Sequence, residues 1–148
     1  MLAQVQQAER PKAKIEIVPV LADNLMPYVG PVIPLLEPAL AREGDVRVID
    51  VFAELNAGRM QLWAIEREGL VIAAVVTKLV NRPLRKLLQI LYVGGRNIED
   101  WIDRLEVIEG WAKSEGAVKV EVVCREGLHP ILKRRGYRRT HFVETKEL

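Results

Sequence analysis

The stretch that decides the fold is residues 86–124, KLLQILYVGGRNIEDWIDRLEVIEGWAKSEGAVKVEVVC. An apolar run at 86–93 is followed by Gly94 and Gly95, then by apolar residues at helical spacing, and then by an alternating run at 118–124. The succession of strand, glycine turn, helix and strand predicts a βαβ unit, whose two strands run parallel with a right-handed crossover.

The middle of this unit predicts one helix that starts at a cap on Asn97 and ends at Gly116. Asp100, at the third helical position, completes a weak capping box. Four apolar residues at i, i+4, i+7 and i+11 make the stripe that this helix is expected to bury. They are Trp101, Leu105, Ile108 and Ala112.

On the N-terminal side, residues 1–13 are polar and aperiodic, and we expect a flexible arm there. Residues 14–20 alternate as a strand. Prolines at 27, 31, 34 and 38 predict short helical turns rather than one long helix. Asp45 is expected to cap a further helix, with Val48, Ile49, Phe52 and Leu55 as its apolar stripe, that ends at Gly58.

Two runs at 60–66 and 70–80, joined at residues 67–69, predict a hairpin, and the second run is apolar on both faces as in a central strand. After 86–124, Pro130 is expected to begin a short helix through Arg135, and residues 137–145 a last strand. The resulting class is α/β, with a mixed, mostly antiparallel central sheet, a parallel βαβ unit at about 86–124 and helices on both faces. Residues 14–148 are expected to form one domain.

Composition narrows the kind of protein. The chain has 148 residues, a net charge of +2 and one cysteine, Cys124, so no internal disulfide is formed and no Cys/His cluster has metal-ligand spacing. The longest apolar run, 70–76, is far shorter than the roughly 20 residues that cross a bilayer. No hydrophobic signal precedes the domain. These features favour a cytoplasmic protein without a metal.

Positive charge is concentrated in two segments, 78–86 and 125–139. Such segments face a polyanion, such as nucleic acid or a phosphorylated cofactor, or they are solvated surface. The exposed aromatic residues of a single-strand platform are missing between these bases, which makes nucleic acid the weakest of the candidate partners.

Several motifs together resemble the GNAT (GCN5-related N-acetyltransferase) superfamily, over roughly residues 14–148. They are Leu91-Tyr92-Val93-Gly94-Gly95, the helix end at 109–117, the strand at 118–122, and Leu132-Lys133-Arg134-Arg135-Gly136-Tyr137. More narrowly, Gly94-Gly95, Trp111-Ala112, the run at 124–127 and the closing residues 145–148 resemble the short GNAT-like proteins of bacteriophages and prophages.

The resemblance implies that acetyl-CoA or another acyl-CoA binds at the end of the 86–93 strand and transfers its acyl group to an amine. The cofactor-binding residues that it implies are Leu91, Tyr92, Val93, Gly94, Gly95, Arg96 and Asn97. The glycines are adjacent, whereas the family's pyrophosphate loop has the pattern Gln/Arg-x-x-Gly-x-Gly/Ala. Leu132 stands where many members carry the tyrosine that acts as general acid.

The catalytic residues are therefore unassigned. Glu121 is interpreted as a strand residue rather than a general base, His129 as a helix cap, and Cys124 as a buried thiol rather than a nucleophile. Two functions stay open beside nucleic-acid binding. The first is an acyl-CoA-dependent N-acyltransferase. The second is a non-catalytic phage or prophage accessory protein that uses the scaffold to bind a partner, either a phage protein or a second copy of the chain.

Overall fold

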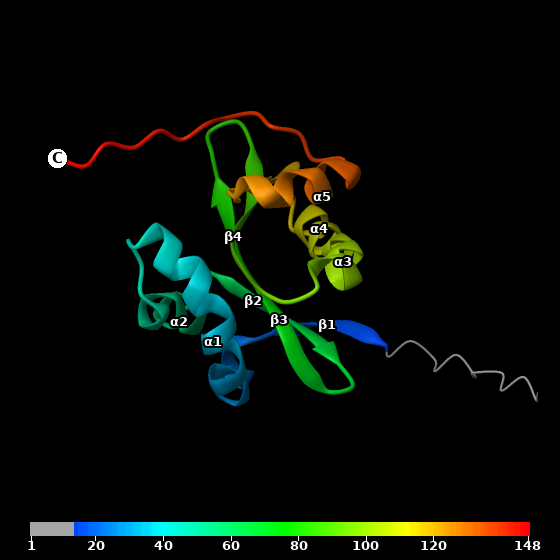
Figure 1. Ribbon diagram of the computed structural model, residues 1–148. Helices are drawn as coiled ribbons and strands as arrows, with labels where there is room; N and C mark the ends of the chain where they lie inside the picture. The colour runs from blue at the N-terminus through cyan, green and yellow to red at the C-terminus, as the bar shows by residue number, and fades with distance from the viewer. Residues whose placement is uncertain (1–13) are drawn as a thin grey trace, which may run out of the picture. The chain divides into compact units, whose positions relative to one another are not determined.

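The computed structural model describes residues 14–148, and the arm expected at 1–13 lies outside them. Its five-stranded sheet follows the order of the chain, from β1 to β5 (Figure 1). The strands are β1 (Ile15–Val20), β2 (Gln61–Arg67), β3 (Leu70–Asn81), β4 (Lys86–Gly95) and β5 (Lys119–Val122). β1 is antiparallel to β2, and β4 is parallel to β5. The expected mixed α/β class and the parallel βαβ unit are thereby confirmed.

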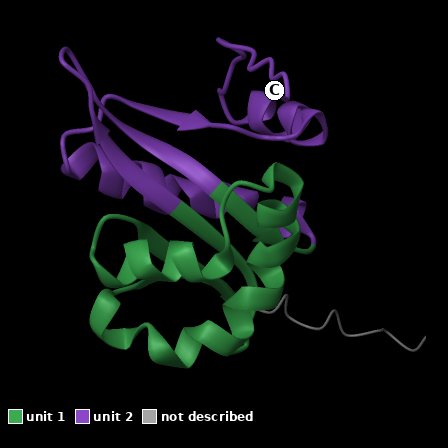
Figure 2. Ribbon diagram, turned by 90° about the vertical axis from the view of Figure 1, so that its left-hand side faces the viewer, with its two compact units in different colours: residues 1–76, 92–96 green, residues 77–91, 97–148 purple. Residues whose placement is uncertain are grey.

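The chain forms two compact units, coloured separately in Figure 2. Unit 1 comprises the described residues up to Val76 together with Tyr92–Arg96, and unit 2 comprises Thr77–Leu91 and Asn97–Leu148. β3 and β4 therefore each contribute one part to unit 1 and the other part to unit 2. That residues 14–148 act as one domain remains a prediction.

Unit 1 holds a long helix that the sequence did not predict. α1 (Met26–Glu43) is continuous over 18 residues and contains Pro31, Pro34 and Pro38, so the expectation of short turns was wrong. The prolines recur at i, i+3 and i+7, and all of them are exposed, while Val32 and Leu36 on the other face are fully buried. A carbonyl that loses its helical partner to proline on this exposed face can bond to water instead, which lowers the cost of the proline.

α2 (Val48–Asn56) is confirmed, but its start and its buried face differ from expectation. The cap is Arg47 rather than Asp45: the Arg47 backbone N–H donates to the Asp50 carboxylate over 2.9 Å, and the Arg47 guanidinium pairs with the same carboxylate. Val51 and Leu55 are buried, whereas Ile49 is exposed. The short helix η1 (Ala22–Asn24) precedes α1.

In unit 2 the single helix predicted between Asn97 and Gly116 is divided into α3 (Ile98–Trp101), the 3₁₀ turn η2 (Ile102–Arg104) and α4 (Leu105–Ser114). The predicted stripe is nevertheless confirmed, because Trp101, Leu105, Ile108 and Ala112 are all buried. After β5 come η3 (Glu126–Leu128) and α5 (His129–Arg134), close to the helix expected at 130–135.

The last predicted strand is absent: residues 137–145 pair with no strand among the described residues. Phe142 and Val143 are 81% and 79% exposed. Alternation of side chains indicates that a segment suits a sheet, but a strand also needs a neighbouring backbone to bond to. Of the helices between residues 14 and 148, none is both long and apolar enough to cross a membrane.

Candidate functional site

The predicted cofactor residues lie at the end of β4 and in the turn that follows it. The pairs between β4 and β5 run from Leu87–Lys119 to Ile90–Val122. β5 ends at Val122, whereas β4 continues to Gly95. Residues 91–95 therefore extend beyond the last recorded pair with β5. The expected parallel direction is confirmed, and the two strands stop pairing before Cys124, as the acyl-CoA interpretation requires.

Gly94 and Gly95 have a packing role within unit 1. A Cβ atom at Gly94 would lie 1.8 Å from the carbonyl oxygen of Leu35 in α1. A Cβ atom at Gly95, whose φ is +139°, would lie 2.4 Å from the Cβ of Ala73 in β3. The missing side chains thus let β4 lie directly against a helix and a neighbouring strand. Close approach of the backbone was expected, but toward a ligand.

Tyr92, between these glycines and the paired part of β4, is buried. Burial raises the pKa of its phenol, and the carboxylates of Glu43 and Asp45 raise it further because they repel a phenolate. The hydroxyl therefore keeps its proton at neutral pH. Through this burial Tyr92 anchors the end of β4 in unit 1.

The turn into α3 differs from a standard helix start. Asn97 is at the cap position, but its φ is +53° and its side chain makes no capping hydrogen bond. The Asp100 backbone N–H donates to the Asn97 carbonyl oxygen over 2.9 Å. Glu99 forms an exposed ion pair with Arg134 at 3.2 Å. Part of the negative charge beside the turn is thus matched within unit 2.

Glu121 is unsuited to act as a general base. Its carboxylate accepts bonds from both Arg82 guanidinium nitrogens at 3.1 Å and lies 3.4 Å from the Lys119 amine. Burial acts to raise the pKa of Glu121, but the bonds from Arg82, Lys119 and Gln89 outweigh it, and the net pKa is lowered. A carboxylate held in its charged form has little tendency to take a proton. The interpretation as a strand residue stands.

The other candidates also lack catalytic geometry. Cys124 is exposed, so the expectation of a buried thiol was wrong. Its pKa is raised, chiefly by partial desolvation, against the opposing charge of Arg139. His129 is the first residue of α5 rather than its cap. Leu132 is buried and has no proton to donate.

Unit 2 contains a group of titratable side chains that sequence analysis missed. Glu109 on α4 is half-buried, and this burial raises the pKa of its carboxyl group. The nearby Tyr137 hydroxyl and the positive charge of Arg135 act to lower the same pKa, but burial outweighs them. Burial also raises the pKa of Tyr137, as does the charge of Glu109. The Tyr137 hydroxyl and the Arg135 Nε are buried without a hydrogen-bond partner within normal geometric limits. No short motif joins positions 109 and 137, so only the fold reveals this group.

A second group lies in unit 1. The Tyr28 hydroxyl of α1 donates to the Glu66 carboxylate of β2 over 3.0 Å. The pKa of Tyr28 is raised by burial and by this bond. Among residues 14–148, no three His, Cys, Asp or Glu side chains are grouped so that they could hold a metal ion.

Comparison with known proteins gives matches at the level of structure. No protein-family model matches the sequence. No curated protein matches it either.

Three solved structures illustrate the similarity. A GCN5-related N-acetyltransferase from Ralstonia eutropha is 18% identical, with a TM-score of 0.64 over 90% of this chain and 99% of that chain. A predicted acetyltransferase with acetyl-CoA from Clostridium acetobutylicum is 15% identical, with a TM-score of 0.65 over 90% of this chain and 96% of that one. A ribosomal-protein-alanine N-acetyltransferase from Brucella melitensis is 10% identical, with a TM-score of 0.65 over 91% of this chain and 98% of that one. The chain therefore has the GNAT fold.

Proposed function

We propose that this GNAT-fold chain is an acyl-CoA-dependent N-acyltransferase that transfers an acetyl group from acetyl-CoA to an amine. The observation that carries the proposal is the continuation of β4 to Gly95 after its parallel pairing with β5 ends at Ile90. In open α/β sheets, ligands bind beyond the carboxyl ends of the strands. The structural similarity to acetyltransferases supports the choice of reaction, since fold alone allows several chemistries.

The residues at the end of β4 fit one part of this cofactor better than the other. Backbone N–H and C=O groups of residues 91–93, beyond the last pair with β5, suit the amide-bearing pantetheine arm. Leu35 and Ala73 occupy the space beside the two glycines, where a phosphate would otherwise approach the backbone. The helix α3 that follows has only four residues. The phosphates would therefore depend on Arg96 and on the backbone of the turn. We therefore propose modest affinity for acetyl-CoA.

When bound, acetyl-CoA supplies a thioester that an amine can attack. The chain's own contribution in this proposal is to hold the cofactor along residues 91–97. Leu132 cannot protonate the leaving thiolate, and Glu121 is held charged, so the proposal assigns both proton transfers to solvent. Its setting is the cytoplasm, where a lone exposed thiol such as Cys124 stays reduced.

Calorimetric titration of the full chain with acetyl-CoA tests the proposal. We expect saturable binding that Arg96→Glu weakens and that Lys133→Glu, an exposed charge change on α5, leaves unchanged. Thiol release in the presence of a panel of amines then tests for transfer. Absence of binding at millimolar acetyl-CoA would contradict the proposal.

A second candidate is a non-catalytic accessory protein, of the phage or prophage kind, that binds a partner through the same scaffold. Two observations favour this candidate. Buried Leu132 stands in place of the tyrosine general acid, and α1 and β3 occupy the space beside Gly94 and Gly95 where the cofactor phosphates were expected. The partner would be a phage protein or a second copy of the chain. Acetyl-CoA binding without transfer to any amine would leave this candidate ahead of the enzyme.

A further inference from the structure

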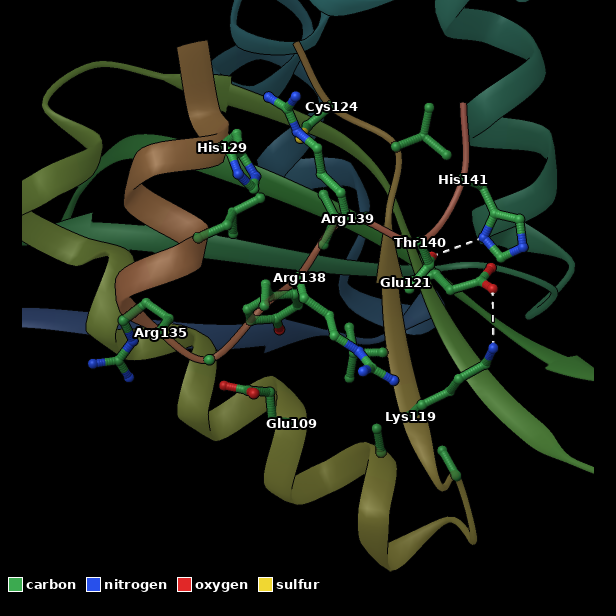
Figure 3. A pocket seen from close by; sticks show the side chains of 18 of the residues that line it. Glu109, Lys119, Glu121, Cys124, His129, Arg135, Arg138, Arg139, Thr140 and His141 are labelled. Atoms are coloured by element: carbon green, nitrogen blue, oxygen red, sulfur yellow. Dashed lines mark hydrogen bonds and ion pairs between the residues drawn. The ribbon is translucent and has the colours of Figure 1, made fainter. Parts of the chain in front are cut away.

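Unit 2 contains a hollow of about 1620 Å³ that is lined by residues of α4 and α5 and by two stretches of consecutive residues. One wall is formed by the consecutive residues 118–124, which include all of β5, and the other by the consecutive residues 136–143 (Figure 3). Successive side chains of a strand point to opposite faces. A space in contact with every residue of a strand therefore reaches the edge of that strand and is not confined to one face.

The hydrogen-bonding groups along this edge are unoccupied. β5 ends the sheet, so the side turned away from β4 has no neighbouring strand among the described residues. Within the same described part, the backbone N–H groups of residues 138–143 make no bond to another backbone group. Adjacent strands are about 4.8 Å apart, so an extended segment at that distance from β5 could bond to its free edge.

Exposed edges are usually blocked by charge or by short length, and β5 has both features with its four residues and Lys119. The surroundings of the hollow are nevertheless apolar at several positions. Val118 and Val123 are exposed beside β5, and Phe142 and Val143 are exposed on the other wall. Exposed apolar residues on both walls are unexpected if β5 is simply a protected edge strand. They favour an added segment that covers these side chains.

The net positive charge of the residues that line the hollow indicates that the added segment carries acidic side chains. Eight basic residues line it against three acidic ones. Two of the acids are already matched, because Glu121 pairs with Arg82 and Lys119, and Glu126 pairs with Arg139. Four basic side chains have no ion-pair partner in the part of the chain that the structure describes. They are Arg85, Lys113, Arg125 and Arg138.

We propose that this hollow, the β5 slot, binds an extended acidic segment of a partner protein as an added strand between β5 and residues 136–143. Main-chain bonds to the free edge of β5 supply affinity, and the unmatched bases select acidic side chains. A second copy of the same 136–143 segment fits less well, because it would add Arg138 and Arg139 to an already basic slot. The proposal does not depend on the transfer of an acyl group.

The test uses the full chain and a fluorescent nine-residue peptide of alternating glutamate and valine. Fluorescence anisotropy at low salt should show binding that weakens as salt rises. A peptide with the same side chains but alternate N-methylated amides should bind about tenfold or more weakly, because it keeps the charge and loses hydrogen bonds. A lysine–valine peptide should not bind. Hydrogen exchange of residues 119–122 should slow when the glutamate peptide is present.

Two matched variants locate the binding. Arg138→Glu, on the wall of the slot, should weaken binding about tenfold, whereas Lys133→Glu, which does not line it, should change it less than about twofold. Equal binding of the methylated and unmethylated peptides would overturn the proposal, since charge alone would then explain it. Tighter binding of a single-stranded oligonucleotide, or a dimer of the free chain with residues 119–122 already protected, would also overturn it.

Discussion

At Gly94, the smallest possible side chain would collide with the backbone of another element. The added Cβ atom would lie 1.8 Å from the Leu35 carbonyl oxygen and 2.5 Å from its carbonyl carbon. Neither atom can rotate away as the end of a flexible side chain can. The helix α1 therefore approaches β4 as closely as it does only because residue 94 is glycine.

We predict that Gly94→Ala lowers the free energy of unfolding by about 1–3 kcal/mol, because α1 or β4 must shift. Gly110→Ala is the matched control: residue 110 lies within α4, and a Cβ there meets nothing within 4 Å. It should raise the free energy of unfolding by about 0.5–1 kcal/mol. Urea denaturation measures both. Equal effects of the two alanines would refute the packing role of Gly94.

Because of Glu109, the free energy of unfolding should depend on pH. Its folded pKa is raised above the ordinary value of 4.5, first by burial, so the folded chain keeps the proton to a higher pH than the unfolded chain. The free energy of unfolding should therefore fall as pH rises from about 4.5 through the raised value.

We predict that Glu109→Gln removes this fall. The variant should be more stable than the original chain at pH 7, and the difference should vanish at low pH, where Glu109 is protonated. Denaturant midpoints across this pH range measure the effect, with the exposed Glu115→Gln at the end of α4 as control. A difference that persisted at low pH would point to altered packing instead of a proton.

Among the elements, α1 shows where sequence patterns and structure diverge. Each proline alone argues against a helix, but Pro31, Pro34 and Pro38 share one exposed face, and the cost of each lost bond is reduced by water. Which face of a helix is exposed depends on the residues packed against the other face, and Gly94 of β4, far away in sequence, lies against the backbone of Leu35 and Leu36.

We predict that Pro34→Ala raises the free energy of unfolding by about 1–2 kcal/mol, since the new N–H can donate to the Gly30 carbonyl. Pro27→Ala should have little or slightly unfavourable effect, because Pro27 lies in the first turn, where no helical donor is needed. Thermal or urea unfolding of the two variants measures the contrast. No gain from Pro34→Ala would mean that the Gly30 carbonyl already has a better partner in water.

The βαβ unit was predictable because its signals are local. Alternation at 86–93 and 118–124, and the stripe from Trp101 to Ala112, are set by neighbours within a few turns of chain. The absent strand at 137–145 and the cluster of Glu109 with Tyr137 were not predictable, because each depends on which backbone or charge lies nearby in space. For the same reason, the sequence placed glycines at 94 and 95 but did not reveal that they face Leu35 and Ala73.

For the molecule as a whole, the division into units does not follow the order of the chain. Residues 77–91 of unit 2 are inserted between the two parts of unit 1. The exposed turn at 82–85 contains Arg82 and Arg85, which trypsin can cleave unless a following proline protects the site, as Pro83 does for Arg82. A cut after Arg85 would leave each fragment with parts of both units.

We predict that chain cleaved once after Arg85 stays associated and elutes as intact protein under native conditions. Each fragment holds strands whose hydrogen-bond partners are in the other, including β3 beside β4. Brief trypsin treatment followed by gel filtration and denaturing electrophoresis tests this. Separation of the two fragments without denaturant would contradict the prediction, because it would show that the pairing of β3 with β4 does not hold them together. The double variant Arg85→Gln, Lys86→Gln should resist the cut and serves as control.

The interleaved units also set an order for folding during synthesis. All of unit 1 has been made once Arg96 has been added, whereas unit 2 still lacks α4, β5 and α5. Until Lys119–Val122 follows, the nascent chain carries the Leu87–Ile90 edge of β4 without its parallel neighbour. Growing polypeptides with such an open apolar edge are prone to aggregate. A pause of the ribosome between codons 96 and 119 would prolong that interval, and we expect it to lower the yield of folded protein.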